Sequence, residues 1–210
     1  MYNMGQGVQQ DNAEASKWYK LAAVQGYADA QYYLGLMYYH CQGVGQDYAE
    51  ALKWMKLTAV QGSAQAQYII GVMFTEGEGV KQNYTEAFKW YKLAAAQGNA
   101  TAQCNIGNMH ATGHGVPQDY AEALKWYKLA AAQGDVRAQN NIGSMYYKGR
   151  GGVAQDDVRA YMWFNFAAVG GEKDAVKNRD IVAAKMSSQQ ISKAREFARE
   201  CQLSQFKQCN

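Results

Sequence analysis

The chain has 210 residues, of which 48% are hydrophobic and 19% charged, and its formal net charge is +3. This composition is typical of a globular protein and excludes a disordered chain, and the mild charge argues against nucleic acid or an anionic membrane as a partner. No apolar run approaches the length of a transmembrane helix, Met1–Gln10 has no signal-peptide core, and four cysteines do not make a disulfide-rich scaffold.

A unit of 36 residues recurs along the chain. Each copy carries one tryptophan, at intervals of 36 residues and finally 37. These tryptophans are Trp18, Trp54, Trp90, Trp126 and Trp163. The pairs Gln25-Gly26 and Ala30-Gln31 recur at the same interval. This regularity indicates one copied supersecondary unit, so a repeat architecture is the first to consider.

The first half of each unit is predicted to be a helix. In the first full copy this helix covers 28–40, and Ala30, Leu34 and Tyr38 recur on one face at helical spacing. Gly35 lies inside the helix, where glycine costs about 1 kcal/mol relative to alanine. Because a glycine recurs there in every full copy, we expect the backbone of the second helix to approach closely at this point.

The second half of each unit is predicted to be another helix. A Gly-x-Gly-Val connector precedes it, for example at 77–80 and 113–116, and its first glycine, such as Gly77, suits the left-handed residue that ends a helix. Asp47 and Glu50 resemble a capping box at the start of the second helix. Since a lone hairpin cannot bury its apolar face, we expect stacked copies to bury Leu34, Trp54 and their equivalents between neighbours.

The boundaries follow from this interval. We expect a partial first repeat in 1–26 and C-terminal capping helices with a tail in 172–210. The full repeats are 27–62, 63–98, 99–134 and 135–171, the last with one inserted residue. Because Met1-Tyr2 matches Met37-Tyr38, we expect the chain to open inside the last turn of a first helix. It is then either a fragment or a protein with a degenerate first unit.

The C-terminal part departs from the repeat after Gly171. We expect two helices, at 172–185 and 188–201, with a capping box at Ser187 and Gln190. Their polar outer face fits the terminal cap that a solenoid needs for solubility. We expect 202–210 to form a loose tail, and a Cys201–Cys209 disulfide is left open.

The combined pattern is Ala-x-Ala-Gln-x-x-Leu-Gly-x-x-Tyr, then Gly-x-Gly-Val, then Ala-x-x-Trp-Tyr-x-x-Ala-Ala-x-x-Gly. It resembles the Sel-1-like repeat (SLR) family, a 36-residue relative of the tetratricopeptide repeat. The resemblance implies an all-α fold, a right-handed α–α superhelix (solenoid) of helical hairpins. It also implies a non-enzymatic adaptor or scaffold for protein complexes, often in bacterial envelope, secretion or host-contact settings, and favours a periplasmic or secreted protein. Cys41 and Cys104 occupy unrelated repeat positions, so the properties of the family's cysteine-paired branch do not carry over.

Four positions of each first helix vary between copies and lie opposite the face shared by all copies. We call them the variable column; in the first full copy they are residues 29, 33, 36 and 40. In a superhelix of this type the first helices line the concave side, so we expect this groove to bind an extended peptide or protein segment through apolar contacts and amide hydrogen bonds. The residues expected to carry this binding are Tyr33, Leu36, Ile69, Val72, Asn105, Asn108, Asn141 and Ser144. As an alternative, Tyr33 and Leu36 mark where a missing first helix or a second copy packs, which would give self-association through the N-terminal repeat.

No motif for catalysis, a cofactor or a metal is evident, so we expect none of these. His110 and His114 have the spacing of zinc ligands on a helix, but Gly113 is expected to end that helix before His114. The recurrent lysines of the second helices follow glutamates by one turn, as Lys17 follows Glu14, which indicates a solvated outer face. The alternative function is an RNA-binding helical array that reads its ligand through one variable column.

Overall fold

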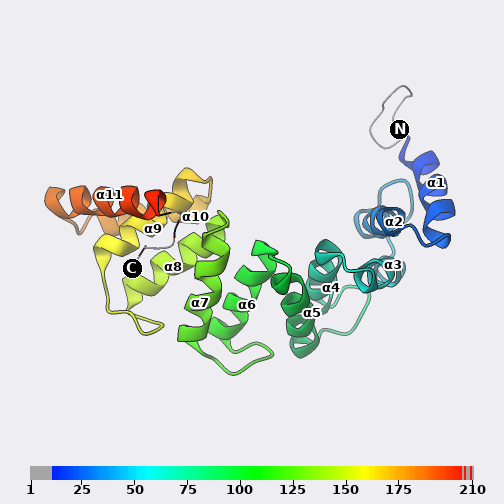
Figure 1. The fold of residues 1–210 in the computed structure, drawn as a ribbon, viewed down its shortest axis with the longest axis horizontal. Coiled ribbons are helices and arrows are strands. Elements are labelled where there is room, and N and C mark those ends of the chain that lie inside the picture. The colour runs from blue at the N-terminus through cyan, green and yellow to red at the C-terminus, as the bar shows by residue number, and fades with distance from the viewer. Residues whose placement is uncertain (1–10, 205, 207–208, 210) are drawn as a thin grey trace. The chain divides into compact units, whose positions relative to one another are not determined.

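The computed structural model describes residues 11–204, 206 and 209, and this part of the chain folds into eleven α-helices with no strand (Figure 1). The match of Met1-Tyr2 to a helix end lies outside the described residues. The chain forms two compact units, Met1–Gln97 and Gly98–Asn210. No described helix is both long and apolar enough to cross a lipid bilayer.

In the first unit, each helix packs on the next. Its helices are α1 (Asn12–Val24), α2 (Ala28–His40), α3 (Tyr48–Val60), α4 (Ala64–Glu76) and α5 (Tyr84–Ala96). In the second unit, α6 packs on α7, α7 on α8 and α8 on α9, while α10 and α11 both pack on α9. These helices are α6 (Ala100–Thr112), α7 (Tyr120–Ala131), α8 (Val136–Lys148), α9 (Asp157–Val169), α10 (Lys173–Ala183) and α11 (Ser188–Leu203).

Local side-chain chemistry sets where these helices begin and end. The Asp47 carboxylate accepts a hydrogen bond of 3.0 Å from the backbone N–H of Glu50, as expected for an N-cap. The Glu50 side chain pairs with Lys53 at 2.9 Å instead of closing a capping box. At the other end, Gly77 ends α4 with a φ of 79°, and Cys41 takes the same left-handed conformation after α2, with a φ of 56°.

The glycine inside each first helix faces a side chain of the second helix. A Cβ added at Gly71 would lie 2.5 Å from the ring of Tyr91, and one at Gly107 would lie 2.5 Å from the ring of Tyr127. The expected close approach therefore exists, but at these two glycines a ring of the second helix fills the space, whereas at Gly35 the backbone oxygen of Ala51 does lie close, 3.4 Å from an added Cβ.

Recurrent glutamines form hydrogen bonds within each hairpin and between neighbouring hairpins. The Gln97 amide donates to the Gln67 side-chain oxygen at 2.8 Å, and the Gln67 amide donates to the backbone oxygen of Ala59 in the preceding hairpin at 3.3 Å. The same side-chain pairing joins Gln61 to Gln31, also at 2.8 Å. The bond to Ala59 joins neighbouring hairpins, whereas each glutamine pair lies within one hairpin, and together they satisfy the buried side chains of Gln31 and Gln67.

Not every tryptophan is buried as expected. Trp54 packs with Ala23, Ala30 and Leu34 in a buried cluster of the first unit. Trp18 is 57% exposed, whereas Trp163 is 2% exposed. Trp90 and Trp126 are half-buried. The expectation that the equivalents of Trp54 are buried is therefore wrong for Trp18 and met only in part at these two tryptophans.

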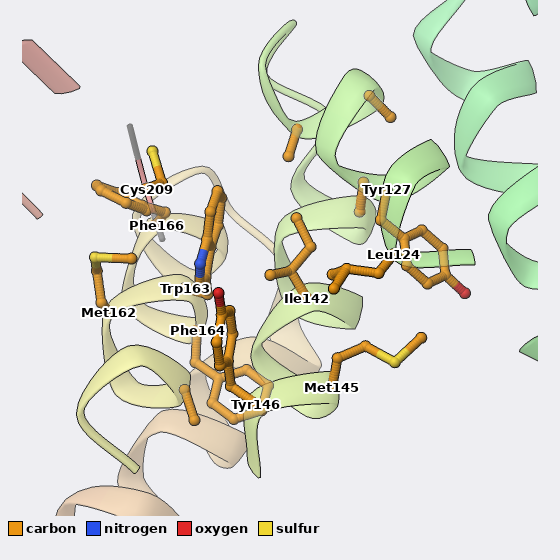
Figure 2. Packing of buried hydrophobic residues seen from close by; sticks show 14 of the residues in the cluster. Leu124, Tyr127, Ile142, Met145, Tyr146, Met162, Trp163, Phe164, Phe166 and Cys209 are labelled. Carbon is orange, nitrogen blue, oxygen red and sulfur yellow. The ribbon is translucent and has the colours of Figure 1, made fainter. Parts of the chain in front are cut away.

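The core of the second unit runs from α6 to the C-terminal residues. Figure 2 shows Ile142 between Leu124 and Tyr127 on one side and Trp163 and Phe166 on the other. A further ring, Phe206, lies 5.2 Å from the ring of Phe166, centroid to centroid. The core of this unit therefore includes a residue that follows the last helix.

The end of the chain is held against this core. A disulfide joins Cys201 to Cys209, and Cys209 is part of the buried cluster. The expected loose tail is therefore wrong for Phe206 and Cys209, the two residues beyond Ser204 that the structure describes. The predicted capping box of Ser187 and Gln190 is confirmed, with both reciprocal hydrogen bonds present.

Candidate functional site

The variable column is accessible to solvent in both units. None of its residues is buried, whereas the opposite face contributes Leu34, Ile70, Ile106 and Ile142, all at most 1% exposed. Each first helix therefore has one buried face that the copies share and one solvent-accessible face that differs between copies.

In the first unit, the expected site residues present apolar surface. Tyr33 is exposed and stacks on Tyr19 of α1 with ring centroids 5.4 Å apart. Leu36 of α2 and Ile69 and Val72 of α4 are half-buried. These side chains therefore keep part of their apolar surface open to a ligand.

In the second unit, the structure brings two of the expected amides together. The Asn141 Nδ2 atom of α8 donates to Oδ1 of Asn108 on α6 at 2.9 Å. The Tyr127 hydroxyl of α7 donates to the same oxygen at 2.8 Å. Because this oxygen accepts two hydrogen bonds, Asn108 offers a ligand its N–H donors rather than its acceptor. Asn105 of α6 is half-buried and does not share these bonds.

A cavity of about 220 Å³ opens beside this amide pair. Asn141 and Ser144 of α8 line it, together with apolar surface from Met145 and Ala111. Asn105 and Asn108 are not among its described lining residues. The predicted site residues of the second unit therefore converge in part, through Asn108, Asn141 and Ser144.

Two cations in this cavity were not among the predicted site residues. Lys148, the last residue of α8, and Arg150, two residues later, both line it. The Arg150 Nη1 atom donates to the Tyr120 hydroxyl at 3.1 Å, and its guanidinium carbon lies 4.9 Å from the centroid of that ring. None of the described lining residues is a carboxylate.

The sequence contains a signal that could have identified Arg150. It is the middle residue of the Gly-x-Gly connector, and the corresponding residues of the other copies are Gln42, Glu78 and His114. A charge that changes at one position of a short connector indicates a variable surface rather than a structural requirement. Sequence reasoning treated this connector only as a turn, so the position was passed over.

The histidines, cysteines and lysines considered in the sequence analysis give no further candidate site among the described residues. Within the described part of the chain, no group of three or more His, Cys, Asp and Glu side chains could hold a metal ion. Cys104 is buried, and burial raises the pKa of its thiol to about 12, so the reactive thiolate is disfavoured. The predicted pairing of the outer lysines is confirmed, for example between Lys17 and Glu14 at 2.9 Å.

A second cavity, of about 310 Å³, lies against the C-terminal residues. Phe166 and Val169 of α9 line it together with Phe206. None of its described lining residues carries a charge, so this cavity has few groups that could select a ligand by charge.

These features place the protein in the class of all-α solenoids built from stacked helical hairpins. The chain belongs to the Sel1 repeat family. The family model, Sel1 repeat, matches residues 1–27, 28–63, 64–99, 100–135 and 136–171. The comparison with curated proteins gave no match.

Solved structures of similar proteins agree with this assignment. One is a protective antigen present in uropathogenic Escherichia coli strains displaying an SLR fold, at 41% identity and a TM-score of 0.79, covering 83% of this chain and 37% of that one. A second is a Sel1 repeat protein from Oxalobacter formigenes, at 37% identity and a TM-score of 0.79, covering 84% of this chain and 72% of that one. Helicobacter pylori cysteine rich protein B shares the fold at 20% identity and a TM-score of 0.52, covering 63% of this chain and 98% of that one.

The chain therefore spans a little over a third of the length of the E. coli antigen that it resembles. Sel1-repeat proteins are generally scaffolds for protein–protein interactions rather than enzymes.

Proposed function

We propose that this protein is a non-enzymatic scaffold that binds an extended segment of a protein or peptide along its variable column. The observation that carries the proposal is the contrast between the two faces of the first helices. One face is fixed and buried, while the other differs between copies and stays accessible in each unit. Surface variation on a constant frame is how repeat proteins acquire a partner.

The two units offer different chemistry to such a segment. In the first unit, Leu36, Ile69 and Val72 bury apolar side chains of the ligand. In the second unit, the Asn108 amide donates to a backbone carbonyl of the ligand, and its hydrogen bonds to Tyr127 and Asn141 hold it in place beforehand. Such preorganisation lowers the entropy that is lost on binding.

The experiment uses a random-peptide phage library as the probe. Peptides that the whole chain selects are synthesised, and their affinities are measured by fluorescence anisotropy for the wild type and for the triple variant N105A/N108A/N141A. We expect the triple variant to bind at least about tenfold more weakly, because each lost hydrogen bond is worth about 0.5–1.5 kcal/mol.

A matched variant, K17A/K53A/K125A, removes exposed lysines of the outer face that are paired with glutamates. We expect it to bind like the wild type, and thermal unfolding checks that both variants fold. Unchanged affinity of the triple variant, or selection of no peptide at all, contradicts the proposal. Salt-dependent binding of single-stranded RNA in place of peptide would favour the RNA-binding alternative.

A further inference from the structure

We propose that the cavity between α6, α7 and α8 binds a carboxylate of the peptide partner, from an aspartate or glutamate side chain or from its C-terminus. This inference rests on the proposed function, because the cavity lies beside Asn108 and Asn141 on the variable column. It adds a chemical selectivity that the column alone does not supply. The carboxylate is the ligand, and Lys148 and Arg150 are the groups that select it.

The Arg150 guanidinium is held in place by Tyr120. The ring lies under the guanidinium, and the hydroxyl accepts one of its N–H groups at 3.1 Å. These contacts use one N–H donor, and the planar guanidinium carries five, so others remain for a ligand. A guanidinium fixed in this way matches the two oxygens of a carboxylate better than a mobile ammonium does.

The backbone around Arg150 supports this position. Arg150 lies between Gly149, with a φ of 60°, and Gly151, with a φ of 77°. A Cβ at Gly151 would lie 2.7 Å from the backbone oxygen of Tyr120, so only glycine lets the connector approach α7 this closely. The glycines therefore bring Arg150 to the ring that orients it.

Several carboxylates at the starts of α7 and α9, which precede or follow the cavity residues in sequence, have other partners. The Asp119 carboxylate accepts hydrogen bonds from the first turn of α7, Glu122 pairs with Lys125 at 2.8 Å, and Asp156 pairs with Arg159. No ion pair of Lys148 or Arg150 is present among the described residues. The cavity thus has two cations without a matching anion.

The size and polarity of the cavity favour a single residue as the ligand. Its volume of about 220 Å³ is below the range of about 300–1,000 Å³ that is typical of small-molecule and cofactor sites. The apolar surface of Met145 and Ala111 suits the methylene groups of an acidic side chain, and Ser144 adds a hydroxyl donor. A nucleic acid would need a longer basic stripe than two cations provide.

The repeat itself shows that this charge is not required by the fold. The positions of Lys148 and Arg150 correspond to Glu76 and Glu78 in the repeat 63–98. There Glu78 accepts a hydrogen bond from the Tyr39 hydroxyl at 2.5 Å. The connector of 135–171 is one residue longer, but the first helix and the glycine that ends it are common to both repeats and occur with either charge. We therefore expect substitutions at 148 and 150 to test recognition, and thermal unfolding checks that each variant folds.

The test uses the synthetic peptides selected from the phage library. Each acidic residue of a bound peptide is replaced by its amide, and a further version carries an amidated C-terminus. Affinities of all versions are measured for the wild type, K148Q, R150Q and the double variant, with K125Q as a control on the outer face of α7. Thermal unfolding checks each variant.

We expect K148Q/R150Q to weaken binding at least about tenfold, and removal of one carboxylate from the peptide to do the same. The two changes together should cost little more than either alone, because they remove the same interaction. K125Q should leave the affinity unchanged. Added salt should weaken binding only between the wild-type protein and the peptide that carries the carboxylate.

Two results overturn the inference while the proposed function stands. One is a peptide that binds through the column with equal affinity for the wild type and K148Q/R150Q. The other is a phosphoserine version that binds about tenfold more tightly than the acidic peptide, which would assign the cavity to phosphate. Failure to select any peptide would instead remove the proposed function, and this inference with it.

Discussion

At the scale of single residues, the most informative position is the glycine inside each first helix. Glycine is the poorest helix former apart from proline, yet it recurs in the middle of α2, α4, α6 and α8. In α4 the space beside Gly71 is filled by the ring of Tyr91, which is 2% exposed. In α2 the neighbour of Gly35 is the flexible end of Met55, at 2.9 Å from an added Cβ.

This contrast predicts different outcomes for the same substitution. Gly71→Ala forces the buried Tyr91 ring to move, and this overpacking outweighs the gain in helix propensity, so the free energy of unfolding should fall by about 1–2 kcal/mol. Gly35→Ala should be close to neutral, because the Met55 side chain can shift away. Denaturant unfolding of both variants measures the difference, and equal losses would contradict this account of the glycine.

At the scale of helices, hydrogen bonds between side chain and backbone join one hairpin to the next. Gln67 is 7% exposed, donates to the Ala59 carbonyl of α3 and accepts from Gln97 after α5. Gln97 belongs to the same hairpin as Gln67, whereas Ala59 belongs to the preceding one, so the bond to Ala59 exists only when the hairpins are stacked. The glutamine of the recurrent Ala-Gln pair thus serves the junction between repeats.

Gln67→Leu should therefore destabilise the first unit. It keeps the apolar part of the side chain but removes the hydrogen bond to Ala59 and the one accepted from Gln97, while the Ala59 carbonyl keeps the backbone N–H of Gly62. Each lost bond costs about 0.5–1.5 kcal/mol. Gln65→Leu, on the exposed side of the same helix, is the control and should change stability by no more than about 0.5 kcal/mol. The midpoint of urea unfolding measures both, and similar shifts would argue against the glutamine as a junction residue.

At the scale of the whole molecule, the chain consists of two compact units with different ends. In the first unit Trp18 of α1 is largely exposed. In the second unit, α10 and α11 pack on α9, and Phe206 lies on Trp163 and Phe166. The C-terminal residues thus cover apolar surface of the last repeat, as a terminal cap requires.

The Cys201–Cys209 disulfide should contribute measurably to the second unit. Closing a loop of 8 residues stabilises the folded state by about 2–3 kcal/mol in the chain-entropy account. Reductant should therefore lower the denaturant midpoint of the second unit in the wild type and in C41S, and have no effect on C201S/C209S. Identical unfolding of the wild type with and without reductant would show that the disulfide adds no stability.

The sequence by itself determined the features that depend on neighbours within about one helical turn. The start of α3 at Asp47, the left-handed end of α4 at Gly77 and the capping box at Ser187 were all predicted correctly. Each depends on contacts among residues a few positions apart, and such contacts can be recognised from spacing. The repeat interval then supplied the fold class, because one hairpin copied several times must stack.

Only the tertiary structure decided which residues from different hairpins meet. Asn108 and Asn141 are 33 residues apart, Tyr120 and Arg150 are 30 apart, and no local spacing relates them. Phe206 was expected in a loose tail, yet it contacts rings about 40 residues upstream. The physical reason is that such contacts depend on how hairpins are oriented when they stack, and packing of whole helix faces sets that orientation.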